Sequence, residues 1–217
     1  YIYVILINAI VVFLTGMLGL LLFNSIEFIL FLPLFYIIYW SLRKNLKVQN
    51  LFILISSYLF YSLWDYRFLS LIIISSSTDY LLGRLIYHET NQSKKTLLLV
   101  VSIFINIGIL VLFKYYNFFI ENLIEFISCL GINPNITSLQ IILPVGISFY
   151  TFQTLSYTID IYRGKIKPTN NIVGFFAFVA FFPQLVAGPI IRARNFLPQL
   201  REKIEGFDSP GKLKQIV

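Results

Sequence analysis

Charged residues are scarce in this chain of 217 residues, at 12% of the sequence. A soluble domain carries about 25% charged residues, because its surface must face water. Apolar residues make up 58%, and the mean hydropathy is +0.80. The shortage of charge excludes a water-soluble globule. The apolar excess predicts an all-α integral membrane protein, built as a bundle of transmembrane helices in a lipid bilayer.

Cysteine and histidine each occur once, as Cys129 and His88. A single cysteine excludes an intrachain disulfide, and the two residues offer no cluster for a structural zinc or other metal site. Cys129 stands in an apolar stretch and is predicted to be a buried, unreactive thiol. Any Ser/His/Asp or Cys/His catalytic scheme would have to use His88. His88 lies in a polar segment and is predicted to be a solvated loop residue.

Methionine also occurs once, at Met17. Residues 1–22 are long enough to span a bilayer, and they lack the basic start and the cleavage site of a signal peptide. Two explanations stay open. Either residues 1–22 form a genuine first helix, or Met17 is the true start and residues 1–16 lie upstream of it.

Apolar runs separated by short polar breaks predict the membrane spans. Asp65–Arg67 and His88–Lys95 are two of these breaks. An amphipathic helix along the membrane interface is predicted at 120–131, followed by a turn at 131–138, and a short helix is predicted in the tail at 195–204. The predicted spans are 1–22, 26–42, 48–64, 68–87, 96–119 and 139–162.

The net charge of +7 is carried by short basic segments between the apolar runs. This pattern is typical of the positive-inside bias of membrane proteins rather than of nucleic-acid binding. Basic segments at 43–47, 84–95 and 163–167 all fall on one side, which we assign to the cytoplasm. A full crossing by 171–191 would place the basic tail on the opposite side. We therefore expect 171–191 to turn back inside the membrane, at Pro183 or at Gly188-Pro189.

Two segments are too polar for passive crossings. Residues 143–164 (LPVGISFYTFQTLSYTIDIYRG) concentrate hydroxyl and amide side chains, and Pro144 and Gly146 allow a bent start. Residues 175–194 (FFAFVAFFPQLVAGPIIRAR) contain Pro183, which breaks a helix, and Gln184, an amide side chain in apolar surroundings that needs a hydrogen-bond partner. The alternative is that the hydroxyls bond their own helix or join neighbouring helices, and that the second segment is an ordinary kinked helix.

Asp79 and Asp160 stand within apolar stretches, where an ionisable side chain is a candidate functional group. Arg163 follows Asp160 by three residues, so an i,i+3 ion pair is predicted there. For Asp79, a helix-packing role is favoured over catalysis. The residues alone thus predict a membrane protein with a polar intramembrane pathway and a broken helix.

The two polar segments resemble the membrane-bound O-acyltransferase family, in the bacterial branch typified by the membrane subunit of alginate O-acetyltransferase. LFNSIEFILFLPL at 22–34, DYLLGRLI at 79–86 and FKYYNFF at 113–119 also fit that branch. The resemblance covers about residues 17–217. It implies a partial ring of transmembrane helices around a tunnel, with a broken or re-entrant helix, in the bacterial cytoplasmic (inner) membrane.

The resemblance also implies a reaction, the transfer of an acyl group from a thioester to a hydroxyl of an exported polysaccharide. The thioester, acetyl-CoA or an acyl carrier, is a co-substrate, and no bound cofactor is expected. A periplasmic or extracellular acetylation partner protein is implied as well. The matching positions that would line or shape the tunnel are Ser148, Tyr150, Gln153, Gln184, Gly188, Pro189 and Arg192.

The family's general base is a histidine beyond the segment that matches 175–194, and His88 does not correspond to it. The resemblance therefore implies that residues 1–217 are the amino-terminal part of one longer transmembrane domain, with the catalytic histidine beyond Val217. Alone, they are expected to be inactive. Two alternatives stay open: a transporter, since broken helices also occur there, and a non-catalytic membrane scaffold that passes acyl groups to a partner.

Overall fold

The computed structural model describes residues 26–130 and 143–201, and all regular elements within these ranges are helical, as predicted. The predicted span at 1–22 and the turn at 131–138 lie outside the described residues. The elements are α2 (Ile26–Ser41), a 3-10 turn η1 (Leu42–Lys44), α3 (Leu46–His88), α4 (Gln92–Cys129), α5 (Ile147–Tyr162), α6 (Ile172–Ala180), α7 (Phe182–Ala187) and α8 (Ala193–Phe196).

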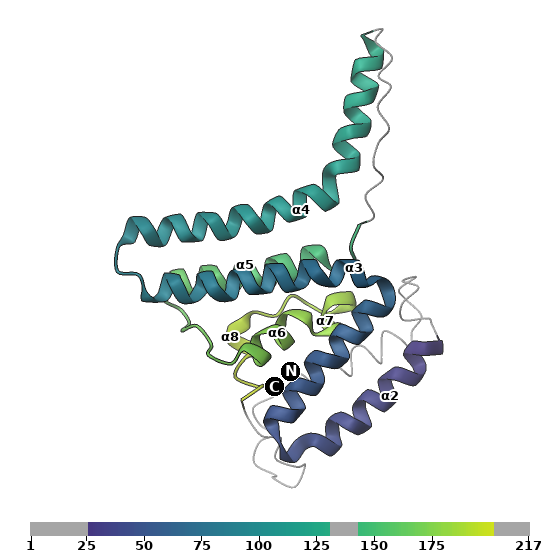
Figure 1. Ribbon diagram of the computed structural model, residues 1–217, viewed down its shortest axis with the longest axis vertical. Helices are drawn as coiled ribbons and strands as arrows, with labels where there is room; N and C mark the ends of the chain where they lie inside the picture. The colour runs from purple at the N-terminus through teal and green to yellow at the C-terminus, as the bar shows by residue number, and fades with distance from the viewer. Residues whose placement is uncertain (1–25, 131–142, 202–217) are drawn as a thin grey trace.

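α3 is one helix of 43 residues, so the predicted break at Asp65–Arg67 is wrong. None of these three residues is glycine or proline, and the helical hydrogen bonds continue through them. The helix bends instead, into two arms that meet at a sharp angle (Figure 1). The hydroxyls of Ser62 and Ser70 each donate to the carbonyl oxygen three residues earlier, at 2.8 and 2.7 Å. Such local bonds compete with the helical ones and favour bending.

α4 is also longer than predicted, with 38 residues. The polar loop expected at 88–95 is reduced to 89–91. It ends there because the side chain of Asn91 accepts hydrogen bonds from the backbone N–H groups of Ser93 and Lys94, and so caps the new helix. The span expected at 96–119 and the interfacial helix expected at 120–131 form one bent helix. Its last turns project away from the other helices (Figure 1).

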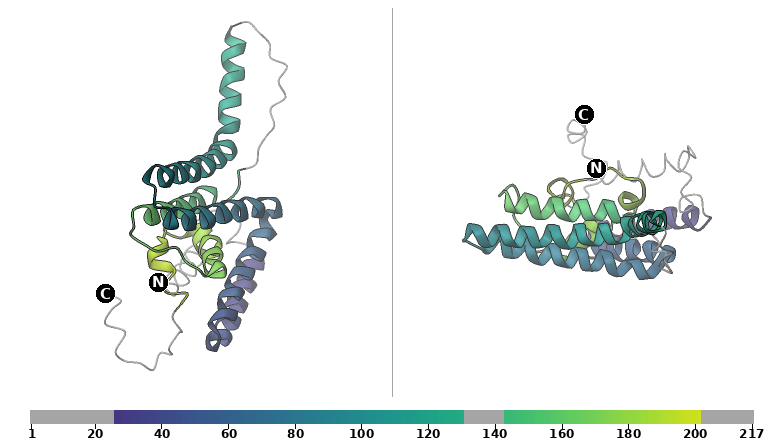
Figure 2. Two further views of the ribbon diagram at one scale, coloured as in Figure 1. Left: turned by 60° about the vertical axis from the view of Figure 1, so that its left-hand side comes forward. Right: turned by 90° about the horizontal axis from the view of Figure 1, so that it is seen from above.

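The short helices α6, α7 and α8 lie in the angle between the two arms of α3 (Figures 1 and 2). α4 lies on the other side of the second arm, and α5 runs beside that arm while also contacting α6 and α8. α2 packs along the first arm. The broken segment is therefore enclosed by helices on several sides, the condition under which irregular backbone is tolerated at membrane depth.

The ring of Phe182 fixes the broken segment against α2 and α3. Its centroid lies 5.3 Å from that of Phe31, 5.1 Å from Phe35 and 5.0 Å from Phe60. These separations are those of favourable aromatic pairs. The preceding ring, of Phe181, lies 5.3 Å from Phe196 in α8. The two successive phenylalanines at the break therefore pack in different directions, Phe181 against α8 and Phe182 against α2 and α3.

The helix breaks at Phe181, two residues before the proline that predicted it. Pro183 consequently falls in the first turn of α7, where no intrahelical N–H bond is needed. The N–H of Phe182, which has no partner within its own helix, approaches the hydroxyl oxygen of Ser57 in α3 at 3.4 Å. The predicted broken helix is confirmed. The backbone N–H that the break frees finds its hydrogen-bond acceptor in another helix, α3.

After α7 ends at Ala187, the chain runs back toward the residues that precede α6. The guanidinium of Arg201 donates to the hydroxyl of Thr169 at 3.1 Å, although 32 residues separate them. The side-chain amide of Asn50, near the start of α3, donates to the carbonyl of Leu200 at 2.7 Å. Residues 169–201 thus form a hairpin whose two ends lie side by side.

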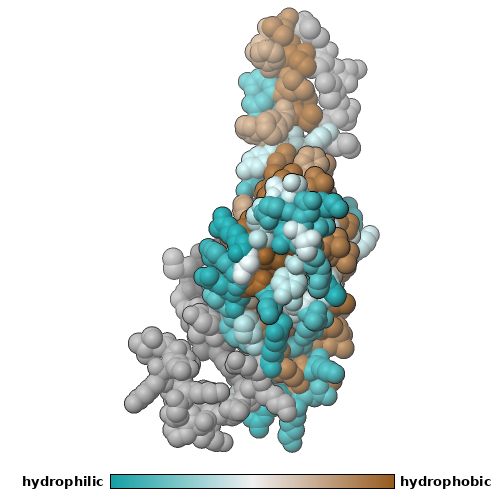
Figure 3. Space-filling model, turned by 90° about the vertical axis from the view of Figure 1, so that its left-hand side faces the viewer, coloured by the Kyte–Doolittle hydropathy of each residue, from teal (hydrophilic) through white to brown (hydrophobic). Residues whose placement is uncertain are grey.

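The same end of the molecule carries the start of α4 and the end of α5. The hydroxyl of Tyr162 lies 3.0 Å from both the amide nitrogen of Gln92 and the hydroxyl of Thr96. Figure 3 shows a hydrophilic face over this end, bordered by apolar surface. The basic segments at 43–47, 84–95 and 163–167 and the described part of the basic tail, 192–201, are therefore compatible with one side of a membrane, because 171–191 turns back.

Among the described residues, two helical stretches are long and apolar enough to cross a membrane, Tyr66–His88 and Gln92–Cys129. Only 39% and 17% of their apolar windows are buried within the protein. The core helix of a soluble protein would be mostly covered, so the low fractions are compatible with helices of a membrane protein.

Candidate acyl-transfer site

A buried polar network joins α3, α4 and α5. Both carboxylate oxygens of Asp79 are occupied: the hydroxyl of Ser102 donates to Oδ1, and the amide of Asn106 donates to Oδ2 at 2.7 Å. The Oδ1 atom of Asn106 in turn accepts from the hydroxyl of Ser75 at 2.7 Å and from that of Thr154 at 3.3 Å. All five side chains are at most 1% exposed.

This network gives Asp79 the packing role that the sequence favoured over catalysis. A buried carboxylate is tolerated when hydrogen-bond donors satisfy it, and here the donors come from a neighbouring helix. Ser102 and Asn106 were not singled out from the sequence. A signal for them was present, because they lie four residues apart in a strongly apolar run and so share one helix face.

A second set of buried polar atoms has no hydrogen-bond partner among the described residues. Tyr150, Gln153 and Gln184 are at most 1% exposed, yet the Tyr150 hydroxyl and both polar atoms of each glutamine side chain are unpaired. Tyr150 and Gln153 lie one turn apart on α5, and Gln184 lies in α7. Burying an unpaired amide costs about 1–3 kcal/mol. These three residues were predicted as tunnel positions.

α7 lies against the first turn of α5, so Gln184 lies in the same region as the start of the helix that carries Tyr150 and Gln153. The start of α5 is also tied to α3, because the hydroxyl of Tyr61 donates to the carbonyl of Val145 at 2.7 Å. A Cβ atom on Gly146 would lie 3.1 Å from the carbonyl oxygen of Leu185, the residue after Gln184. The approach of backbone to backbone at this point leaves little room between the two helices.

Gly146 begins α5 with a φ of 76°, in the left-handed region. Replacement by alanine is expected to destabilise the protein by about 1–2 kcal/mol through the backbone alone, with a further cost from the contact with Leu185. Gly108→Ala is the matched control, because nothing lies within 4 Å of a Cβ there. In a helix it is expected to be neutral or to stabilise by up to about 1 kcal/mol. Thermal unfolding of the two variants in detergent tests the difference, and equal melting temperatures would contradict it.

The other predicted tunnel residues are less enclosed. Ser148 and Gly188 are partly buried, and Pro189 and Arg192 are exposed. Gly188 has a specific steric role, since a Cβ there would lie 2.6 Å from the Cα of Gln184. The structure therefore groups Tyr150, Gln153 and Gln184 as enclosed polar groups. It leaves Pro189 and Arg192 at the surface of the described residues.

The predicted ion pair between Asp160 and Arg163 is wrong. Asp160 is 5% exposed and its Oδ2 atom has no partner among the described residues, whereas Arg163 is exposed. The reason is that α5 ends between them. Arg163 is the residue at which the helix stops, so its side chain is not held on the face that buries Asp160.

Neither single-copy reactive side chain belongs to this site. His88 is the last residue of α3, exposed, with its ring 5.3 Å from that of Tyr87. Cys129 is exposed, so the expected buried thiol is wrong. The reason is that α4 projects beyond the other helices here. Within the described ranges no three His, Cys, Asp or Glu side chains are grouped to hold a metal ion.

These features define the class of protein: a helical membrane protein in which a broken helix and enclosed polar side chains meet. The chain is 37% identical over 188 residues to a Pseudomonas aeruginosa protein named "Probable alginate O-acetylase AlgI", a match that covers 85% of this chain and 35% of that protein. The protein of the same name from Azotobacter vinelandii is 36% identical over 188 residues, covering 85% of this chain and 37% of that protein.

The "Peptidoglycan O-acetyltransferase" of Helicobacter pylori is 31% identical over 211 residues, covering 84% of this chain and 39% of that protein. No family profile and no solved structure matches the chain. The relatives confirm the resemblance to the membrane-bound O-acyltransferase family, and in particular to the branch of the alginate O-acetylases. It spans 35% to 39% of the length of these three relatives.

Proposed function

We propose that these residues are part of a membrane O-acetyltransferase that moves an acetyl group from a thioester to hydroxyls of an exported polysaccharide. The observation that carries the proposal is the group of enclosed, unpaired polar side chains on α5 and α7. It occurs in a chain whose relatives are named as O-acetyltransferases of alginate and peptidoglycan. Polar groups kept unpaired at a cost in stability are characteristic of sites that bind a substrate.

The protein crosses the bacterial cytoplasmic (inner) membrane several times in this proposal, with the hydrophilic end in the cytoplasm. The positive-inside rule supports that orientation. Residues 169–201 then enter the membrane and return to the cytoplasmic side. The thioester, acetyl-CoA or an acyl carrier, arrives at the hydrophilic end, and the polysaccharide arrives from the opposite side, where a periplasmic partner protein receives or presents it.

Tyr150, Gln153 and Gln184 line the tunnel between the two substrates, and Ser148, Gly188, Pro189 and Arg192 shape it. In the reaction the acceptor oxygen bonds to the thioester carbonyl carbon and the carbon–sulfur bond breaks. The hydroxyl proton passes to a base, and the leaving thiolate takes up a proton. The amide N–H groups of the two glutamines are suitable donors for the carbonyl oxygen as it gains negative charge. His88 is too exposed and remote for the base, which the family resemblance places beyond Val217.

The test uses the full-length protein in proteoliposomes with radiolabelled acetyl-CoA or an acetylated carrier protein and a polysaccharide acceptor. We expect base-labile label in the polysaccharide with one of these donors. Residues 1–217 alone are expected to transfer none, because their single histidine does not lie at the enclosed polar groups. If neither donor labels the polysaccharide and the protein instead carries solute across the bilayer, the transporter alternative replaces this proposal.

A further inference from the structure

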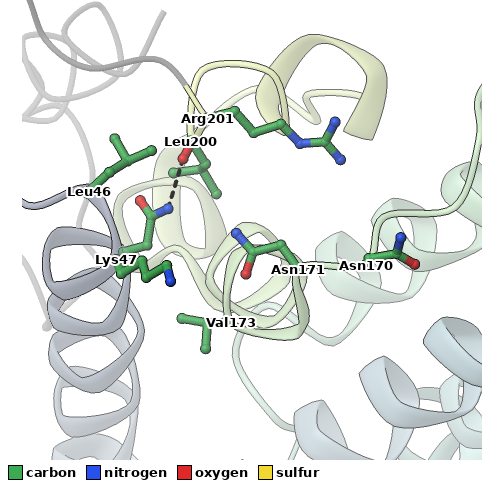
Figure 4. A pocket seen from close by; sticks show the side chains of 8 residues that line it. Leu46, Lys47, Asn170, Asn171, Val173, Leu200 and Arg201 are labelled. Carbon is green, nitrogen blue, oxygen red and sulfur yellow. Dashed lines mark hydrogen bonds between the residues drawn. The ribbon is translucent and has the colours of Figure 1, made fainter.

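A cavity of about 550 Å³ opens at the hydrophilic end of the molecule, away from the enclosed polar groups described above (Figure 4). This volume falls within the range of small-molecule sites. The cavity is formed where the start of α3, the segment leading into α6 and the residues after α8 meet. Its lining residues are Leu46, Lys47, Asn50, Asn170, Asn171, Val173, Leu200 and Arg201.

The lining is positively charged. Lys47 and Arg201 are its two charged residues, and it contains no carboxylate. Over residues 26–130 and 143–201, neither cation has an ion pair with a carboxylate within 4.0 Å. Figure 4 places Lys47 on the α3 wall, Asn171 on the facing wall at the start of α6, and Arg201 on the segment beside them. Two cations without a counter-charge around one cavity attract an anion.

Buried groups fix where these cations stand. Arg201 donates to the hydroxyl of Thr169, which is 1% exposed. The next residue toward the amino terminus, Leu200, accepts from the amide of Asn50, which is 4% exposed and lies three residues after Lys47. The hairpin formed by residues 169–201 is thereby tied to α3, and the tie holds the two cations at the same opening.

We propose that this cavity binds a phosphate group. An arginine fork, a lysine and nearby amide donors match the several acceptor oxygens of a phosphate better than the two oxygens of a carboxylate. Basic pockets between membrane helices at the cytoplasmic side are suited to phosphate-bearing head groups. The phosphate can come from an anionic lipid of the inner leaflet or from a soluble phosphate compound, and the chemistry of the site is the same for both.

The experiment uses the full-length protein, purified in detergent, and the double variant Lys47→Gln with Arg201→Gln. Native mass spectrometry measures retained phosphatidylglycerol against a neutral glycolipid without phosphate, and calorimetry measures binding of inorganic pyrophosphate. We expect the double variant to bind one of the two phosphate probes about 30-fold more weakly, since each basic residue near a membrane surface contributes roughly fivefold in affinity.

The matched control is Lys44→Gln with Arg194→Gln, which removes the same charge from exposed residues of the chain that do not line the cavity. It is expected to change binding less than about twofold, because salt screens exposed charges that do not touch the ligand. Loss of phosphatidylglycerol alone identifies a lipid site, and loss of pyrophosphate alone identifies a soluble ligand. Equal losses in both double variants, or unchanged binding in the first, overturn the proposal. If the first double variant does not fold, Lys47→Gln alone decides, because the Lys47 side chain is exposed.

Discussion

Replacing Gln153 or Gln184 by methionine is expected to lower acetyl transfer by about 100-fold or more without lowering the melting temperature of the protein. Both amides are buried and unpaired among the described residues, so an unbranched apolar side chain of similar size removes a cost of about 1–3 kcal/mol. The same change removes an N–H donor from the proposed site, and losing one such donor to a developing oxyanion costs about 100-fold or more.

Gln49 supplies the matched control for this experiment. It is 2% exposed, but its amide donates to the carbonyl oxygen of Tyr39 at 3.1 Å. Gln49→Met removes that buried hydrogen bond and is expected to lower the melting temperature while the remaining folded protein keeps its activity. The measurements are thermal unfolding in detergent and the proteoliposome transfer assay. If Gln184→Met lowers the melting temperature as Gln49→Met does and keeps full activity, Gln184 is a packing residue.

The broken helix shows how far the sequence leads. Pro183 predicted a break, and the basic tail predicted that the chain returns. Both follow from local chemistry, because proline lacks an N–H and positive charges stay on one side of a membrane. The position of the break does not follow from local chemistry. It lies at Phe181 because Phe182 must reach the aromatic rings of α2 and α3, and that packing depends on residues more than 120 positions away in the chain.

The errors in the predicted helices have the same origin. Asp65–Arg67 and residues 120–131 were separated from the preceding helices by polarity alone, yet polarity does not end a helix when neither glycine nor proline stands at the junction. The ion pair predicted between Asp160 and Arg163 failed because a spacing of three residues is useful only while the helix continues. Which polar atoms remain unpaired, as in Gln184, depends on tertiary contacts and cannot be derived from spacing.

Asp79→Ala is expected to destabilise the protein by about 3 kcal/mol or more. The substitution removes the acceptor of the buried Ser102 hydroxyl and one of the two acceptors of the Asn106 amide, which still donates to the carbonyl oxygen of Ser102, and each buried donor left unpaired costs about 1–3 kcal/mol. Because the network joins three helices, we expect the loss to appear as a lower melting temperature in detergent. Glu125→Ala, which removes an exposed carboxylate from α4, is expected to leave the melting temperature unchanged.

Asp79→Asn separates packing from chemistry. Its side chain has the shape of the original, and it can accept from Asn106 and donate to the hydroxyl oxygen of Ser102, so the network keeps two hydrogen bonds. We therefore expect the asparagine variant to retain most of the stability and of the acetyl transfer. A folded Asp79→Asn protein with a normal melting temperature and no transfer would show that the carboxylate itself takes part in the reaction. In that case α3 would contribute to the active site, rather than only hold α4 and α5 in place around it.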